Sequence, residues 1–112
     1  TLSVGDSITL VVDQTSRTSI TKNHTATHLL QAALVKILGN HIKQAGSLVT
    51  PSSLRFDFNH HQAITDQEID DIELMVNAEI MNNTKVTVRN TTYKAAVEQG
   101  IRATFGEKYN PE

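Results

Sequence analysis

Cysteine is absent from this chain of 112 residues, so its own side chains can form no disulfide and offer no thiolate to a metal ion. Any metal site has to depend on histidine and carboxylate ligands. Long apolar runs are absent as well, whereas about 20 consecutive apolar residues are needed to span a bilayer. We therefore expect a soluble, cytoplasmic protein with no membrane partner.

Linkers and repeats are also missing. Only two prolines occur, and no stretch is rich in proline or serine. The length fits a single domain, and the hydrophobic fraction of 38% allows a modest core. We expect one continuous domain or one piece of a domain.

The charge is nearly balanced, with ten basic and 12 acidic residues and a net charge of −2. This balance is not that of a typical nucleic-acid binder. Six of the acidic residues lie between Asp66 and Glu79, however, so the rest of the chain is formally positive. The acidic run is most simply the solvated face of a helix, and the remainder is able to hold an anionic partner.

The first half of the chain predicts a strand, a helix and a hairpin. Alternating apolar residues predict a strand at Ser7–Val12, and apolar residues three and four apart predict a helix over Ile20–Leu38 that Gly39 ends. Gln44–Val49 and Leu54–Phe58 flank a turn that contains Pro51 and predict a hairpin. Leu54, Phe56 and Phe58 are expected to face the core.

The second half predicts two helices and one more strand. Thr65 and Glu68 form a capping box that opens a helix whose core stripe is expected to be Ile69, Ile72, Val76 and Ile80. A strand is predicted at Lys85–Arg89 and a short helix at Tyr93–Gln99, ended by Gly100. The order predicts an α+β fold, an antiparallel-type sheet with helices packed on it.

Two histidines in the first helix are the main candidates for chemistry. His24 and His28 stand one helical turn apart, a spacing that can present two imidazoles to one metal ion. At about 100° per residue, the pair points away from the apolar stripe of the same helix. A spacing of this kind also occurs in exposed histidines without a ligand. A zinc protease of the HExxH type is excluded, because Thr25 stands where the HExxH motif has its general-base glutamate.

Four motifs in order resemble one known family. They are Asn23-His24-Thr25-Ala26-Thr27-His28-Leu29-Leu30, then Gln44-Ala45-Gly46-Ser47-Leu48-Val49, then Leu54-Arg55-Phe56-Asp57-Phe58, and finally Gly106-Glu107-Lys108-Tyr109. Together they resemble the editing region of bacterial alanyl-tRNA synthetases, over nearly the whole chain. The resemblance implies that 1–18 end a preceding β region and that 19–112 are the N-terminal part of the editing domain.

The resemblance implies an esterase activity with a zinc ion. The parent enzyme ligates alanine to tRNA(Ala) with ATP and magnesium, and its editing domain hydrolyses tRNA(Ala) mischarged with serine or glycine. In the family a Cys and a further His complete the zinc site with the two histidines that His24 and His28 match. This chain has no Cys, so we expect an incomplete zinc site and an inactive isolated piece. The expected partners are the 3′ end of mischarged tRNA(Ala) and the rest of the synthetase.

Two further residues are expected to take part in hydrolysis. The resemblance places Gln44 beside the metal, where its amide is suited to orienting the seryl group or a water molecule. Thr25 offers a hydroxyl near the metal, as does Thr27, although threonines in helices often bond back to their own backbone. Sequence alone leaves open whether zinc activates water or only positions the substrate.

The remaining polar residues are expected to be structural. His41, His60 and His61 lie near the ends of elements, and no catalytic role is expected for them. Arg55 and Asp57 point to the same side of their strand and are expected to pair across the sheet. Three alternatives stay open for the whole: a free-standing trans-editing protein, a threonyl-tRNA synthetase editing domain, and a noncatalytic RNA-binding or structural module.

Overall fold

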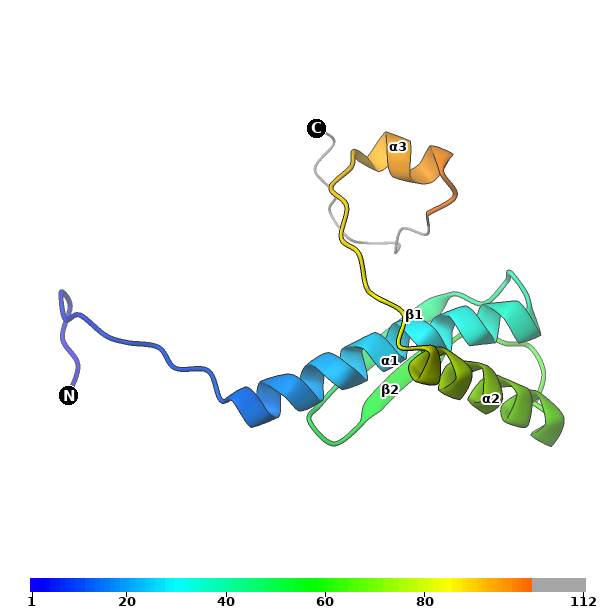
Figure 1. Ribbon diagram of the computed structural model, residues 1–112, viewed down its shortest axis with the longest axis horizontal. Coiled ribbons are helices and arrows are strands. Elements are labelled where there is room, and N and C mark those ends of the chain that lie inside the picture. Colours follow the sequence, from blue (N-terminus) through cyan, green and yellow to red (C-terminus); the bar gives the residue numbers. More distant parts are fainter. Residues whose placement is uncertain (102–112) are drawn as a thin grey trace. The chain divides into compact units, whose positions relative to one another are not determined.

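The computed structural model describes residues 1–101 of the chain. Along the chain it contains α1 (Gln14–Leu38), β1 (Gln44–Val49), β2 (Leu54–Phe58), α2 (Asp66–Asn82) and α3 (Tyr93–Glu98) (Figure 1). The chain divides into two compact units, 1–77 and 78–112. The elements confirm an α+β composition with a two-stranded antiparallel sheet.

Helix α1 begins earlier than the apolar pattern predicts. Asp13 is the N-cap, and its carboxylate accepts a hydrogen bond of 2.7 Å from the backbone N–H of Ser16. The residues that follow are mostly polar, so they add helical turns without adding to the apolar stripe. In Figure 1 these turns extend past the β1–β2 turn. The helix ends as predicted at Gly39, whose φ of 115° suits glycine alone.

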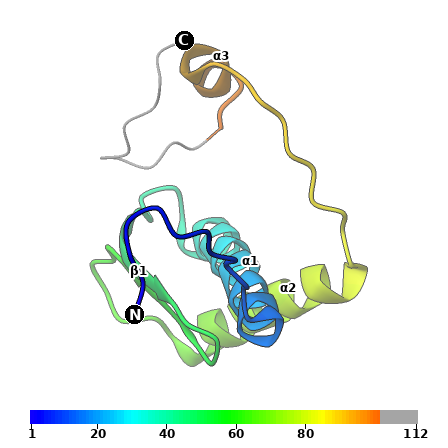
Figure 2. The same cartoon turned by 90° about the vertical axis from the view of Figure 1, so that its left-hand side faces the viewer.

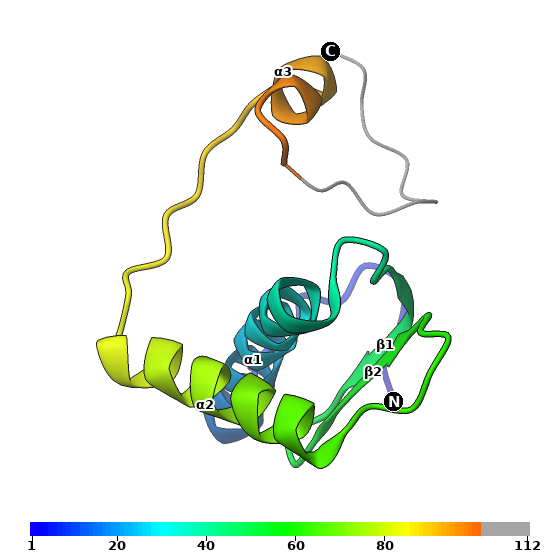
Figure 3. The same cartoon turned by 90° about the vertical axis from the view of Figure 1, so that its right-hand side faces the viewer.

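A small core joins α1 to the hairpin and to the middle of α2. Its buried residues are Ala33, Leu34, Ile42 and Ile72. Phe56 and Phe58 pack against them from β2, as the alternation predicts. Figure 3 shows α1 and the first turns of α2 on the same side of the hairpin, and no other helix or strand within residues 1–77 covers the opposite face, here called the open face.

The expected core stripe of α2 is only half right. Ile72 is buried and Val76 is packed beside it together with Met75, but Ile69 and Ile80 are 42% and 52% exposed. Figure 2 shows that α2 crosses α1 at an angle, and only the middle of α2, at Ile72, Met75 and Val76, contacts the core. A helical stripe in the sequence predicts which face turns inward but not how far the neighbouring elements extend.

Two predicted strands are wrong. The segments 7–12 and 85–89 belong to no strand, and their alternating apolar side chains are exposed, for example Leu10 at 85% and Val88 at 90%. Residues 1–13 contain no strand, and residues 14–18 are the start of α1. A strand needs a neighbouring strand for its backbone hydrogen bonds, and neither segment has one among residues 1–101.

The predicted capping box at the start of α2 is confirmed. The backbone N–H of Thr65 donates to the carboxylate of Glu68 at 2.8 Å, and the backbone N–H of Glu68 donates to the Thr65 hydroxyl at 3.3 Å. The predicted short helix is also confirmed, since α3 begins after the N-cap Thr92 and is followed by Gly100 with a φ of 71°.

Truncation of the core should cost far more stability than truncation of the exposed histidines. Leu34 is 3% exposed, so Leu34→Ala should lower the free energy of unfolding by about 2–5 kcal/mol through the cavity that it leaves. His24→Ala, at an exposed position of the same helix, is the matched control and should cost little. Urea unfolding of both variants tests this, and a larger loss for His24→Ala would contradict the assigned helix faces.

The capping box should make stability depend on pH. Hydrogen bonds from the Thr65 backbone N–H and hydroxyl hold the pKa of Glu68 below its ordinary value of 4.5, with a smaller contribution from His60. This stabilisation is present above the ordinary pKa and is lost as the pH falls through the lowered one. Between neutral pH and about pH 3, Glu68→Gln should therefore lose less stability than the unchanged chain.

Denaturant midpoints at the two pH values measure this difference. Glu73→Gln, which removes one charge from the same helix away from the cap, is the control. It should keep the pH dependence of the unchanged chain, and equal behaviour of the two variants would refute the assignment to the cap.

Candidate functional site

His24 and His28 form an exposed pair on α1. Their ring centroids lie 5.0 Å apart in an edge-to-face arrangement, as expected for side chains one helical turn apart. The buried Ala33 and Leu34 lie on the opposite side of the helix. The core therefore fixes the rotation of α1 and turns both imidazoles towards solvent, as the helical periodicity predicts.

The two threonines between these histidines behave differently. Thr27 is 6% exposed, and its hydroxyl donates to the backbone carbonyl of Asn23 at 2.9 Å, the back-bonding common for threonine in helices. Thr25 is exposed, and its hydroxyl forms no hydrogen bond within residues 1–101. Of these two threonines, only Thr25 presents its hydroxyl to solvent, beside His24.

Asn23 ties the histidine-bearing turn of α1 to the hairpin. Its side-chain amide donates to the carbonyl of Thr50 at 2.9 Å, and the carbonyl of Pro51 lies 3.4 Å away. Both acceptors belong to the turn between β1 and β2. Asn23 belongs to the first sequence motif, but the motif does not indicate this contact, because the two acceptors lie 27 and 28 residues away in the sequence.

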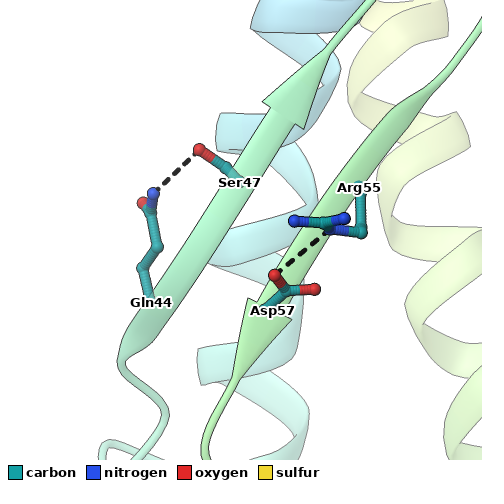
Figure 4. Close-up of polar contacts among 4 residues, drawn as sticks. All are labelled: Gln44, Ser47, Arg55 and Asp57. Carbon is teal, nitrogen blue, oxygen red and sulfur yellow. Dashed lines mark hydrogen bonds and ion pairs between the residues drawn. The ribbon is translucent and has the colours of Figure 1, made fainter.

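Gln44 stands at the start of β1 and is half-buried. Its amide donates to the hydroxyl of Ser47 at 3.0 Å (Figure 4). Residues three apart in a regular strand point to opposite faces, but the pairing with β2 shifts between Gln44 and Gly46. This shift in register brings the side chains of Gln44 and Ser47 together, and the local sequence pattern does not predict the shift.

Gln44 and the histidine pair are separated along the hairpin. Gln44 begins β1 whereas Thr50, the partner of Asn23, follows its other end, and six residues of strand span roughly 20 Å. His28 lies five residues beyond Asn23 along α1, towards Gln44, which shortens the separation by only about 7.5 Å. This spacing suits contact with different parts of one substrate better than contact with one metal ion.

The open face of the hairpin carries an ion pair. Arg55 Nε lies 3.2 Å from a carboxylate oxygen of Asp57, and the side chains are 65% and 45% exposed (Figure 4). The two residues pair with each other along β2, not across the sheet as expected. Asp57 lies opposite Gly46, where a Cβ atom would come within 2.9 Å of its carboxylate. An exposed pair of this kind contributes little to stability.

The three remaining histidines come together, which sequence reasoning missed. His41 lies between α1 and β1, and His60 and His61 follow β2. The candidate ligand atoms of these three side chains all lie within 4.8 Å of one another. Adjacent strands bring the two segments side by side, although about twenty residues separate them in the sequence.

Comparison with known proteins identifies the chain. No protein-family model matches it. The alanine–tRNA ligase of Pseudothermotoga lettingae is 55% identical over 108 residues, 96% of this chain and 13% of that protein. The alanine–tRNA ligases of Nitrosomonas europaea and Thermotoga maritima are 51% and 50% identical over 96% and 97% of this chain and 12% and 13% of their own lengths.

These relatives are aminoacyl-tRNA ligases by name, and the chain is similar to one segment of these enzymes. The chain belongs to the alanine–tRNA ligase family, the alanyl-tRNA synthetases, and spans about an eighth of the length of the relatives it matches. The resemblance of the motifs to alanyl-tRNA synthetases is thereby confirmed. Its fourth motif, Gly106 to Tyr109, lies outside the described residues. No helix among the described residues is long and apolar enough to cross a membrane.

Loss of the Asn23 side chain should loosen the hairpin turn. Asn23→Ala removes a half-buried hydrogen bond between α1 and the Thr50 carbonyl, which should lower the free energy of unfolding by about 1 kcal/mol. Hydrogen exchange at the Thr50 amide, which bonds to Ser53 within the turn, should become faster. Thr21→Ala is the control, since that hydroxyl bonds only back to its own helix. Equal exchange rates in both variants would count against a stabilising role for the hydrogen bond between Asn23 and Thr50.

Proposed function

We propose that this segment is the N-terminal part of an editing domain that hydrolyses tRNA(Ala) wrongly charged with serine or glycine. The observation that carries the proposal is the exposed pair His24 and His28, presented by a helix that Asn23 ties to the hairpin bearing Gln44. Membership of the alanine–tRNA ligase family supplies the substrate class. Under this proposal, ATP- and magnesium-dependent ligation of alanine belongs to other parts of the enzyme.

The charge of α1 supports an RNA partner. This helix contains Arg17, Lys22 and Lys36 and no acidic residue, and all three basic side chains are exposed. The 3′ end of a tRNA carries phosphates that such side chains can contact. Arg17 and Lys22 precede the histidine pair on the same helix. A phosphate contact there would bring the terminal ribose ester towards His24 and His28.

The donor set of the pair suits zinc. Two exposed imidazoles one turn apart are ligands that Zn²⁺ prefers, and zinc sites take four ligands in a tetrahedral arrangement. His24 and His28 would therefore hold half of the zinc shell. A bound zinc ion supplies Lewis-acid polarisation of a water molecule or of the ester carbonyl.

The other residues of the segment would act on the substrate. The Gln44 amide, oriented by Ser47, can donate to or accept from the aminoacyl group or the attacking water. The exposed Thr25 hydroxyl next to His24 can bond to the terminal ribose. Because the strand separates Gln44 from the histidine pair, we assign Gln44 to substrate binding and not to the metal.

Substitutions in an intact synthetase that contains this segment test the proposal. His28→Ala should abolish most hydrolysis of Ser-tRNA(Ala) and lower the zinc content, because it removes a ligand. Gln44→Ala should slow hydrolysis by roughly 100-fold while the zinc content stays unchanged, the effect of removing one positioned donor. Release of labelled serine and zinc content are measured on the same samples.

Arg55→Ala is the control, since this side chain lies on the open face of the hairpin and should leave both readouts unchanged. The chain of 112 residues alone should hydrolyse Ser-tRNA(Ala) no faster than its His24→Ala variant. An intact, zinc-loaded enzyme that is inert towards Ser-tRNA(Ala) and Gly-tRNA(Ala) would refute the proposal and favour a noncatalytic RNA-binding module.

A further inference from the structure

A second histidine cluster lies at the end of the hairpin remote from the β1–β2 turn. His41 belongs to the loop before β1, and His60 and His61 follow β2. The ring centroids of His41, His60 and His61 lie 5.0–5.2 Å from one another. The cluster consists of these three side chains and is separate from the pair His24 and His28.

Two of the three rings already meet through their nitrogen atoms. Nε2 of His41 and Nδ1 of His60 lie 2.9 Å apart, so in the free protein the N–H of one ring donates a hydrogen bond to the nitrogen of the other. Neighbouring nitrogens in a tetrahedral zinc site lie roughly 3.3 Å apart, given Zn–N bonds of about 2.0–2.1 Å. The widest separation within the cluster, 4.8 Å, exceeds this by only about 1.5 Å. Rotation of the exposed His41 and His61 rings can close that difference.

His60 gives an independent indication of a ligand. Its Nε2 atom is buried and has no hydrogen-bond partner among the described residues. Burial of an unsatisfied polar atom costs free energy, so native structures contain few of them. An ion bound at Nε2 of His60 would give this buried atom a partner and offset the cost.

The backbone around the cluster is held in place. Ile42, next to His41, is fully buried, and the Asn59 N–H donates to the Lys43 carbonyl at 3.3 Å, which joins the two segments. A Cβ atom on Gly39 would lie 3.1 Å from Nδ1 of His41, so the glycine leaves room for that ring. Preformed backbone lowers the entropy that a ligand must overcome on binding.

The chemistry of the three side chains selects the kind of ion. Imidazole nitrogens suit zinc, nickel and copper, whereas calcium and magnesium require oxygen ligands. The donor set therefore selects a divalent transition metal.

We propose that His41, His60 and His61 bind one divalent transition-metal ion of the zinc class, distinct from any ion held by His24 and His28. The three imidazoles supply three of the four ligands, and water completes the shell. The ion clamps the loop before β1 to the end of β2. In this chain the three-histidine site binds Zn²⁺ more tightly than the two-histidine pair does.

Zinc titration of the full chain tests the proposal after the other pair has been removed. In His24→Ala/His28→Ala protein, calorimetric titration with ZnCl₂ should show one site, and addition of His41→Ala or His61→Ala should weaken it by roughly 10-fold or more. Zinc should raise the melting temperature of the double variant and not that of the triple variants. Arg55→Ala in the same double variant is the control and should leave zinc binding intact.

A measurement on the double variant alone still tests the proposal if the triple variants fail to fold. Zinc should shift the ring NMR signals of His41, His60 and His61. No shift of these signals, or zinc affinity unchanged by both His41→Ala and His61→Ala, would overturn the proposal. The outcome does not depend on the proposed editing function, because the residues proposed for zinc in editing are absent from the double variant.

Discussion

Packing of one side of α1 against Ile42 and Ile72 is the constraint on which the rest of the structure depends. Ala33 and Leu34 provide that side, and their burial fixes the rotation of the helix. His24 and His28 are exposed as a consequence. The same packing buries Ile42 in the loop that follows the helix, which places His41 beside the end of β2.

The hairpin carries different chemistry at its two ends. At the β1–β2 turn, Asn23 holds the helix that presents His24 and His28. At the other end lie Gln44 with its partner Ser47 and the cluster of His41, His60 and His61. A hairpin packed on a helix is rigid along the strands, so groups at the two ends keep a fixed separation. We expect one substrate to use both ends only if it is long enough to span them.

Strands were the elements that sequence patterns predicted least well. The hairpin was predicted correctly because its two strands follow one another in the chain, joined by a short turn, so each strand has a nearby partner. Ser7–Val12 and Lys85–Arg89 show the same alternation, yet neither is a strand. Alternation reports only that a segment could have one buried face; a strand also requires a neighbour to accept its backbone hydrogen bonds.

Local interactions determined what the sequence by itself could establish: the apolar stripe of α1, the Thr65–Glu68 capping box, the turn at Pro51 and the one-turn spacing of His24 and His28. Each depends on residues at most a few positions apart. The tertiary structure alone decided the Asn23 contact with Thr50, the bulge that joins Gln44 to Ser47, and the meeting of His41 with His60 and His61. These arise from strand register and helix packing, which depend on the geometry of the whole core.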